Sequence, residues 1–147
     1  MDSYIDIVLH ICFSLIAGFI AWKLYGKGNI KSLVIAMFSA LVSGVLIDLD
    51  HFIDHFLTFG FHFNYDYFIG GEYFLRSGKT YIFFHAYEYV ILLGILSIFA
   101  KVKTKKMILT ALGLAMLFHL ITDGLLFTTS IKNYFIFYRI FHNFNVF

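Results

Sequence analysis

The segment Ile47–His55, IDLDHFIDH, concentrates ionisable side chains at the end of an apolar stretch. It holds three aspartates and two histidines within nine residues, and it follows the apolar run SLVIAMFSALVSGVL. Ionisable groups inside a bilayer are costly and mark pairing or function. Asp48, His51 and His55 lie three and seven residues apart, which places them on one face of a regular helix. The other two aspartates point to another side, so we expect them to support the first face or to mark a break in the helix.

Three further apolar segments carry ionisable or polar side chains at helical spacing. They are Asp6, His10 and Ser14, then His85 and Glu88, and finally His119 and Asp123. Residues three or four apart share a helical face, and helix bundles build metal sites from inward-facing carboxylates and imidazoles. A lone histidine often only bonds a neighbour, and Asp–His pairs also occur as proton relays in transporters. The joint pattern favours a metal site over these alternatives.

The residue types restrict the metal and its chemistry. Histidine and carboxylate ligands favour zinc, manganese or iron, and the single cysteine, Cys12, provides neither a disulfide framework nor a thiolate site. The candidate ligands exceed what one tetrahedral ion uses, so we expect two ions, or one ion with supporting residues. Paired ions activate a water and hold the oxygens of a displacement, as in phosphatases and nucleases. A spare carboxylate can act as general base.

The composition places these residues in a membrane protein. Of the 147 residues, 61% are hydrophobic and 14% charged, and the mean hydropathy is +0.83. A helix that spans a bilayer needs roughly 20 residues. Apolar segments of about this length occur at 4–24, 32–57, 80–100 and 107–130. We expect an all-α integral membrane protein whose single domain, 1–147, is a four-transmembrane-helix bundle. The acidic start predicts no cleavable signal peptide, and a net charge of +2 argues against a nucleic-acid partner.

Lysines in the connections give the expected orientation. They fall in the first and third connections, which contain no acid: Lys23, Lys27, Lys31, Lys101, Lys103, Lys105 and Lys106. The positive-inside rule makes these connections cytoplasmic, so both termini and the loop 58–79 lie outside. With a rise of about 1.5 Å per residue, the ionisable residues of all four helices then reach one level in the outer half of the membrane. We expect a multi-pass protein of the cell (plasma) membrane with its site on the extracytoplasmic side.

Two aromatic segments flank the expected site. The loop TFGFHFNYDYFIGGEYFLRSGK (58–79) and the tail KNYFIFYRIFHNFNVF (132–147) are rich in aromatic residues, which favour the headgroup level of a bilayer. We expect the loop to form an interfacial lid hinged at Gly70–Gly71 and the tail to form an interfacial amphipathic helix. The alternative is that both segments only anchor the bundle.

Four short motifs carry a resemblance that covers the four spans: LHICFS, LIDLDH, FFHAYEY and FHLITD. On these motifs the chain resembles the family of small membrane-bound, predicted metal-dependent hydrolases of bacteria and archaea. That family is distantly similar to the zinc-dependent phospholipase C and P1-type nuclease group. The resemblance implies that the ligands or the base are His10, Asp48, Asp50, His51, His85, Glu88, His119 and Asp123. We expect support from Ser14, Asp54 and His55.

The chain departs from this family before its third span. Many relatives carry a histidine–arginine stretch followed by threonine–histidine–serine, whereas this chain has only His85 and Glu88 there. The missing arginine is a candidate phosphate ligand in the relatives, and Arg76 or Lys79 is the candidate replacement here.

Two functions from different classes follow. The preferred one is a membrane hydrolase with one or two ions, zinc before manganese or iron, that attacks a phosphoester or related ester of a lipid or other amphiphile. Asp48 or Glu88 is then the base, and the partner is a membrane lipid or amphiphilic substrate, with a homo-oligomer left open. The alternative is a divalent-cation or proton transporter or channel that uses the same residues. A third reading gives the metal a purely structural role.

Overall fold

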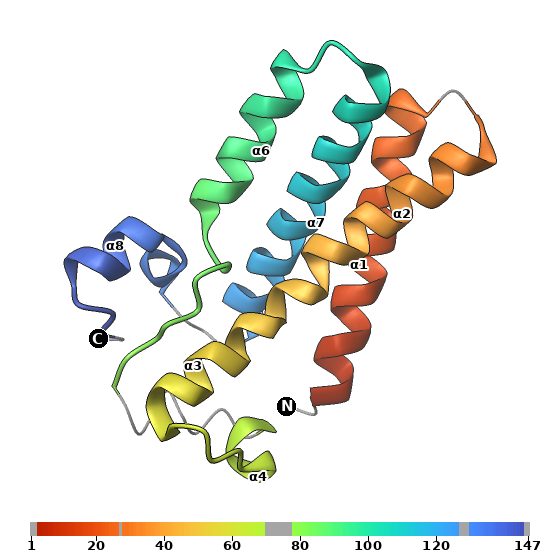
Figure 1. Cartoon of the computed structure of the whole chain (residues 1–147). Coiled ribbons are helices and arrows are strands. Elements are labelled where there is room, and N and C mark those ends of the chain that lie inside the picture. The colour runs from red at the N-terminus through yellow and green to blue at the C-terminus, as the bar shows by residue number, and fades with distance from the viewer. Residues whose placement is uncertain (1–2, 27, 70–77, 127–129, 146–147) are drawn as a thin grey trace.

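The chain folds into helices joined by short connections (Figure 1). The structure is a computed structural model, and it describes residues 3–26, 28–69, 78–126 and 130–145. No strand occurs among these residues, so the all-α prediction is confirmed for the described part of the chain. The elements are α1 (Ser3–Tyr25), α2 (Ile30–Gly44), the 3-10 turn η1 (Leu46–Leu49), α3 (Asp50–Phe59), α4 (Tyr65–Ile69), α6 (Tyr87–Phe99), α7 (Lys103–Leu126), the 3-10 turn η2 (Ile131–Tyr134) and α8 (Ile136–Phe141).

Three helices are long and apolar enough to cross a membrane. They cover Ile5–Tyr25, Ile30–Phe59 and Lys103–Leu126, and their outer faces expose many large apolar side chains. These helices indicate a membrane protein. The fourth expected span, 80–100, is helical only from Tyr87 to Phe99, which is 13 residues, so a fourth crossing stays a prediction.

Small side chains form the centre of the bundle. α1, α2 and α7 pack against one another, and the buried residues between them are mostly alanine: Ala17, Ala21, Ala36, Ala40, Ala111 and Ala115. Lipid tails are as apolar as leucine, so membrane helices associate through close packing of small residues rather than through a hydrophobic driving force. Gly44 marks the closest approach, because a Cβ there would overlap Oγ of Ser14 on α1 and lie 3.2 Å from Cβ of Ala115 on α7.

The second apolar helix changes its winding where the aspartates begin. α2 ends at Gly44, η1 follows as a tighter 3-10 turn, and α3 resumes the α-helix at Asp50. A 3-10 turn has about 3.0 residues per turn instead of 3.6, so it rotates the side chains that follow. The expected break is therefore present. It directs Asp48 toward the bundle, while Asp50 and Asp54 face a different segment.

That segment is the strap, residues 79–86, which precedes α6. The strap is not helical, and the sequence-based expectation of a helix from residue 80 is wrong for this part. The amide of Thr80 donates to the carbonyl of Phe144 (2.8 Å), and an isolated antiparallel bridge joins Lys79 to Asn145. The strap consequently runs between α3 and the C-terminal segment (Figure 1). His85 lies on this extended segment and does not share a helical face with Glu88.

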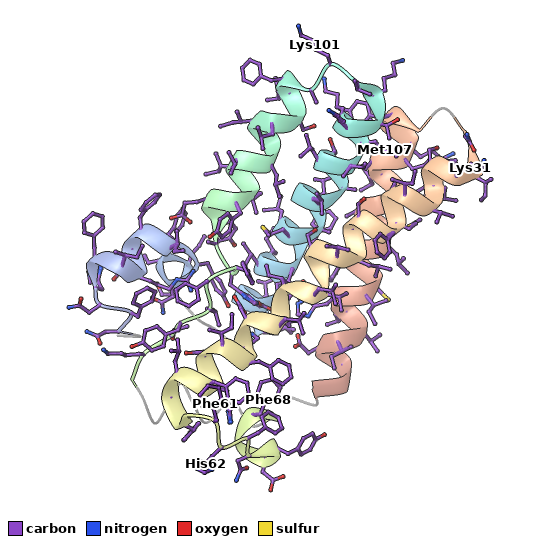
Figure 2. The ribbon with its side chains drawn as sticks, in the orientation of Figure 1. Lys31, Phe61, His62, Phe68, Lys101 and Met107 are labelled. Carbon is purple, nitrogen blue, oxygen red and sulfur yellow. The ribbon has the colours of Figure 1, made fainter. Side chains whose placement is uncertain are left out.

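The lysine-rich turns and the polar helix ends lie at opposite ends of the bundle. Figure 2 shows Lys31 and Lys101 at one end, and Phe61 and His62 at the other. Rings from α3, α4 and their connection stack there, including Phe52 with Phe68 at 4.4 Å. The interfacial placement of the aromatic loop and tail stays a prediction, and the Gly70–Gly71 hinge lies outside the described residues.

Candidate metal centre

Side chains from α1, η1, α3, the strap and α7 meet in one cluster at the end of the bundle opposite the lysines. The cluster holds seven potential ligands, which fall into overlapping groups with ligand atoms within 4.8 Å of one another: Asp6, His10, Asp48, His51, His85, His119 and Asp123. His10, His85, His119 and Asp123 are buried. The sequence therefore predicted correctly that residues from four apolar segments reach one level.

Four ligand atoms form the centre of this cluster. Nε2 of His85 and Nε2 of His119 lie 3.0 Å apart. Oδ1 of Asp48 lies 3.2 Å from the first and 3.3 Å from the second, and Oδ2 of Asp123 lies 3.6 Å and 3.2 Å from them. Two ligands of a tetrahedral zinc ion, each about 2.1 Å from the metal, lie about 3.4 Å apart. The observed separations match that spacing.

The protons on these histidines face away from the centre. Nδ1 of His119 lies 3.1 Å from the carbonyl oxygen of Gly44, which can only accept, so Nδ1 carries the proton. Nδ1 of His85 lies 3.0 Å from Oδ1 of Asp50, and a carboxylate likewise accepts. In the neutral imidazoles both Nε2 atoms then hold lone pairs. Two lone pairs and two carboxylate oxygens then face one another, and either a bound metal ion or protons on the imidazoles would satisfy such a set.

A second group of ligands adjoins the first through Asp123. Oδ1 of this carboxylate lies 3.1 Å from Nε2 of His10, and Nδ1 of His10 lies 3.6 Å from Oδ1 of Asp6. Neither ring nitrogen of His10 has a hydrogen-bond partner with good geometry, although both are buried. The His10 ring stacks on the His119 ring at 3.9 Å. Buried polar atoms without partners are costly. Asp6, His10 and Asp123 together could therefore hold a second cation.

One side of the cluster reaches the surface. The Asp48 side chain is 38% exposed and that of His51 is 23% exposed, with Nε2 of His51 3.6 Å from Oδ1 of Asp48. Residues next to Asp48 and His85 in the chain are apolar. Leu46, Leu49 and Phe84 are each about half exposed. The carboxylate therefore opens onto a hydrocarbon surface rather than onto a polar one.

Hydrogen bonds from behind hold the ligands in place. The Ser14 hydroxyl donates to the His10 carbonyl (2.6 Å). Oδ2 of Asp50 accepts the amide of Phe84 (2.6 Å) while the same carboxylate orients the His85 ring. Carboxylates and carbonyls that accept the second N–H of a metal-binding histidine fix its tautomer and orientation. The bond from Ser14 is to the backbone of its own helix, so support of the site by Ser14 stays a prediction.

The strap is held from both sides by charged residues. On the α3 side, Asp50 and Asp54 accept its amides, the latter from Tyr81 at 2.9 Å. On the α8 side, the fully buried Arg139 donates to the carbonyls of Ile82 and His85. Burial lowers the pKa of Arg139 below its usual value, and the nearby Asp50 carboxylate opposes this shift. The extended strap thus finds partners for its backbone without forming helix or sheet.

Other predicted site residues have different contacts. The Glu88 carboxylate accepts the amides of Ile136 and Phe137, both at 3.1 Å, and so caps the start of α8. Glu88 and Asp50 both lie outside the groups of candidate ligands, and their assignment as ligands stays a prediction that these contacts do not favour. Nε2 of His55 lies 3.3 Å from the carbonyl oxygen of His62, away from the cluster.

The two expected substrate cations stay predictions. Lys79 lies in the bridge between the strap and the C-terminal segment, and Arg76 lies outside the described residues. Sequence reasoning missed two other residues. Asp6 was recognised on the face of His10 but was not counted as a ligand, whereas Arg139 lies in a tail that gave no signal of burial.

Comparisons with family models, curated proteins and solved structures found no match for this chain. The site must therefore be interpreted from its own geometry. Its buried histidines and aspartates lie close enough together to hold a metal ion.

Proposed function

We propose that this protein is an integral membrane metal-dependent hydrolase that cleaves a phosphoester or related ester of a lipid-like substrate. The observation that carries the proposal is the convergence of two imidazole nitrogens and two carboxylate oxygens at the spacing of metal ligands, beside a partly exposed carboxylate that opens onto apolar surface. The family resemblance of the four sequence motifs agrees with this class of reaction.

The ligands of the first ion would be Asp48, His85, His119 and Asp123. A second ion would bind Asp6 and His10 and share Asp123. A divalent ion at such a site supplies a more acidic bound water and polarises a phosphoryl oxygen. Zinc fits the His and carboxylate donors best, while manganese and iron use similar ligands.

The chain's own residues supply proton acceptance and water exclusion. Asp48 and His51, the partly exposed members of the cluster, are placed to take the proton of an attacking water. The buried His10, His119 and Asp123 close the opposite side of the site. A substrate would therefore reach the reacting atoms only from the Asp48 side.

The same proposal covers the membrane topology. We place a fourth crossing at 80–100, with the strap completing what α6 lacks in length, and we place α4 and α8 at the interface on the side of the cluster. The lysines at the opposite end support a cytoplasmic location for those turns. The cluster and both termini then face the extracytoplasmic side of the plasma membrane.

A transport role has less support. An ion path needs polar groups through the whole bilayer. In the described part of the chain, the buried side chains between the cluster and the lysine-rich turns are those of alanine, methionine and serine, with no ionisable group among them.

Elemental analysis of the detergent-purified protein tests the proposal. We expect stoichiometric divalent metal in the wild type, and its loss in His119→Ala and Asp48→Ala at unchanged helix content. His62→Ala is the matched control, because its side chain is exposed and outside the cluster. Metal-dependent hydrolysis of alkyl phosphodiesters should then be lost in the first two variants only.

Three results would contradict it. A wild type without metal after reconstitution would favour a proton relay. Metal-dependent flux in proteoliposomes that survives substitution of Asp48 and His51 would favour a transporter. Unfolding on metal removal, with no turnover of any phosphoester by the loaded protein, would assign the metal a structural role.

A further inference from the structure

An apolar groove runs along the outside of the bundle, from the cluster toward the lysine-rich turns. It lies between α2 and α6, which both pack on α7 rather than mainly on each other. α7 forms its floor with Leu112 and Met116, and the volume is about 480 Å³. Sites for small molecules commonly occupy about 300–1,000 Å³, so the groove is large enough to hold a ligand.

The groove begins at the opening of the cluster. Ile47 and Phe84 line the end of the groove nearest the cluster. They immediately precede Asp48 and His85 in the chain. Asp48 is the cluster residue with the most exposed side chain. The apolar groove therefore ends beside the polar opening, at residues adjacent in sequence to Asp48 and His85.

The groove presents hydrocarbon along its length. Its one serine, Ser43, donates its hydroxyl to the carbonyl of Leu112 at 2.7 Å, so this group is already paired. Leu112, the lining residue of α7 farthest from the cluster, lies seven residues before His119, which is about 10 Å along the helix. One leaflet of a bilayer has a hydrocarbon thickness of about 15 Å. The groove thus covers about two thirds of the depth that one lipid chain occupies.

We propose that this groove binds one long acyl or alkyl chain of an amphiphilic substrate, with its ester headgroup at Asp48. The inference rests on the proposed function for the identity of the ligand as a substrate. The occupant follows from three features: the groove lies on helices long and apolar enough to span a membrane, its lining is mainly apolar, and it ends beside the polar cluster. A chain that leaves the bilayer for the groove gains little affinity, since lipid and groove are equally apolar. The groove fixes the position of the headgroup instead.

Photolabelling tests the groove without requiring turnover. The probe is a hexadecyl phosphonate with a diazirine near the middle of the chain, the part expected to reach the groove floor. Its carbon–phosphorus bond resists ester hydrolysis. We expect it to label the α7 floor of the purified protein in nanodiscs. Unlabelled hexadecyl phosphonate should compete, whereas butyl phosphonate should not.

Two neighbouring tryptophan substitutions provide matched variants. Leu92 lines the groove and is 51% exposed, while Ile91 is 57% exposed and lies outside it. Leu92→Trp should lower labelling of the floor about tenfold, since an added ring overpacks the space. Ile91→Trp should leave labelling unchanged. Even labelling over all lipid-facing positions, insensitive to Leu92→Trp, would overturn the proposal.

Kinetics separate the groove from the proposed function. With alkyl phosphodiesters of increasing chain length, kcat/KM of the wild type should rise, and Leu92→Trp should abolish the preference for long over short chains. Equal hydrolysis of all lengths would refute the groove and keep the hydrolase. Labelling of the groove without hydrolysis would refute the hydrolase and keep the groove. A dimer that Leu92→Trp dissociates, with no label in the groove, would make this face an interface between copies and overturn the proposal.

Discussion

Arg139→Gln should release the strap from the C-terminal segment. The buried guanidinium donates to two strap carbonyls, those of Ile82 and His85. A hydrogen bond from a charged donor contributes about 1.5–3 kcal/mol. Two such bonds give about 3–6 kcal/mol, and water that enters the loosened end recovers part of it, so we expect the low value of about 3 kcal/mol.

Hydrogen exchange at the amide of Phe84 measures this change. That amide donates to Asp50 and is protected only while the strap stays closed. A loss of about 3 kcal/mol corresponds to exchange that is faster by about 100-fold. Amides in the middle of α7 should keep their protection, because local opening does not require the core helices to separate.

Lys132→Gln is the control, since it removes one cation from the same segment at an exposed position. It should leave exchange at Phe84 unchanged. Exchange in Arg139→Gln within about twofold of wild type would refute the role of the arginine in holding the strap. Lost protection throughout α1 and α7 would also refute it, because Arg139 would then be required for the whole fold.

Further substitutions test individual contacts. Glu88→Gln removes the charge that caps α8 and should destabilise by about 0.5–2 kcal/mol in thermal melts while lowering kcat only severalfold; a loss of about a thousandfold would restore Glu88 as the general base. Asp50→Asn exchanges an ionised acceptor for an amide, so we expect metal affinity in chelator competition to fall about 10–100-fold with the ligand set intact; unchanged affinity would contradict its role in orienting the histidine. Gly44→Ala forces α1 and α2 apart and should destabilise by about 1–3 kcal/mol, whereas Gly94→Ala, which meets nothing within 4 Å, should be neutral or stabilising in the same melts.

The sequence predicted the cluster where the helices run without interruption. His119 and Asp123 lie on one continuous helix, so their spacing of four residues correctly placed both in the site. The same holds for His10 on α1. The depth of a residue in the membrane follows from its position along the helix and the rise per residue. The position of the helix in the sequence follows from the length of the apolar segment.

Prediction failed where distant residues decide the backbone. The strap sequence, KTYIFFHA, contains neither proline nor glycine, and its apolar length predicted a helix from residue 80. Its β-branched and aromatic residues are weak helix formers, and the helix begins only at Tyr87. The extended form of the strap depends on Asp50, Asp54 and Arg139, which lie far away in sequence. The contacts of Glu88 could not be predicted for the same reason, because α8 supplies the amides that it accepts.

The origin of the cluster in successive helices has a consequence for biogenesis. Asp6 and His10 enter the membrane with α1, and Asp48 enters with η1 directly after α2, but Asp123 arrives only when α7 has been synthesised. Until then the early helices carry polar groups whose partners do not exist, at a cost of up to about 3 kcal/mol for each charged residue deep in the bilayer. Nascent chains that end before α7 should therefore remain beside the insertion machinery and be extracted by alkaline carbonate. The helices would be released into the lipid only after His119 and Asp123 have been synthesised. Until then the insertion machinery would retain the helices already made.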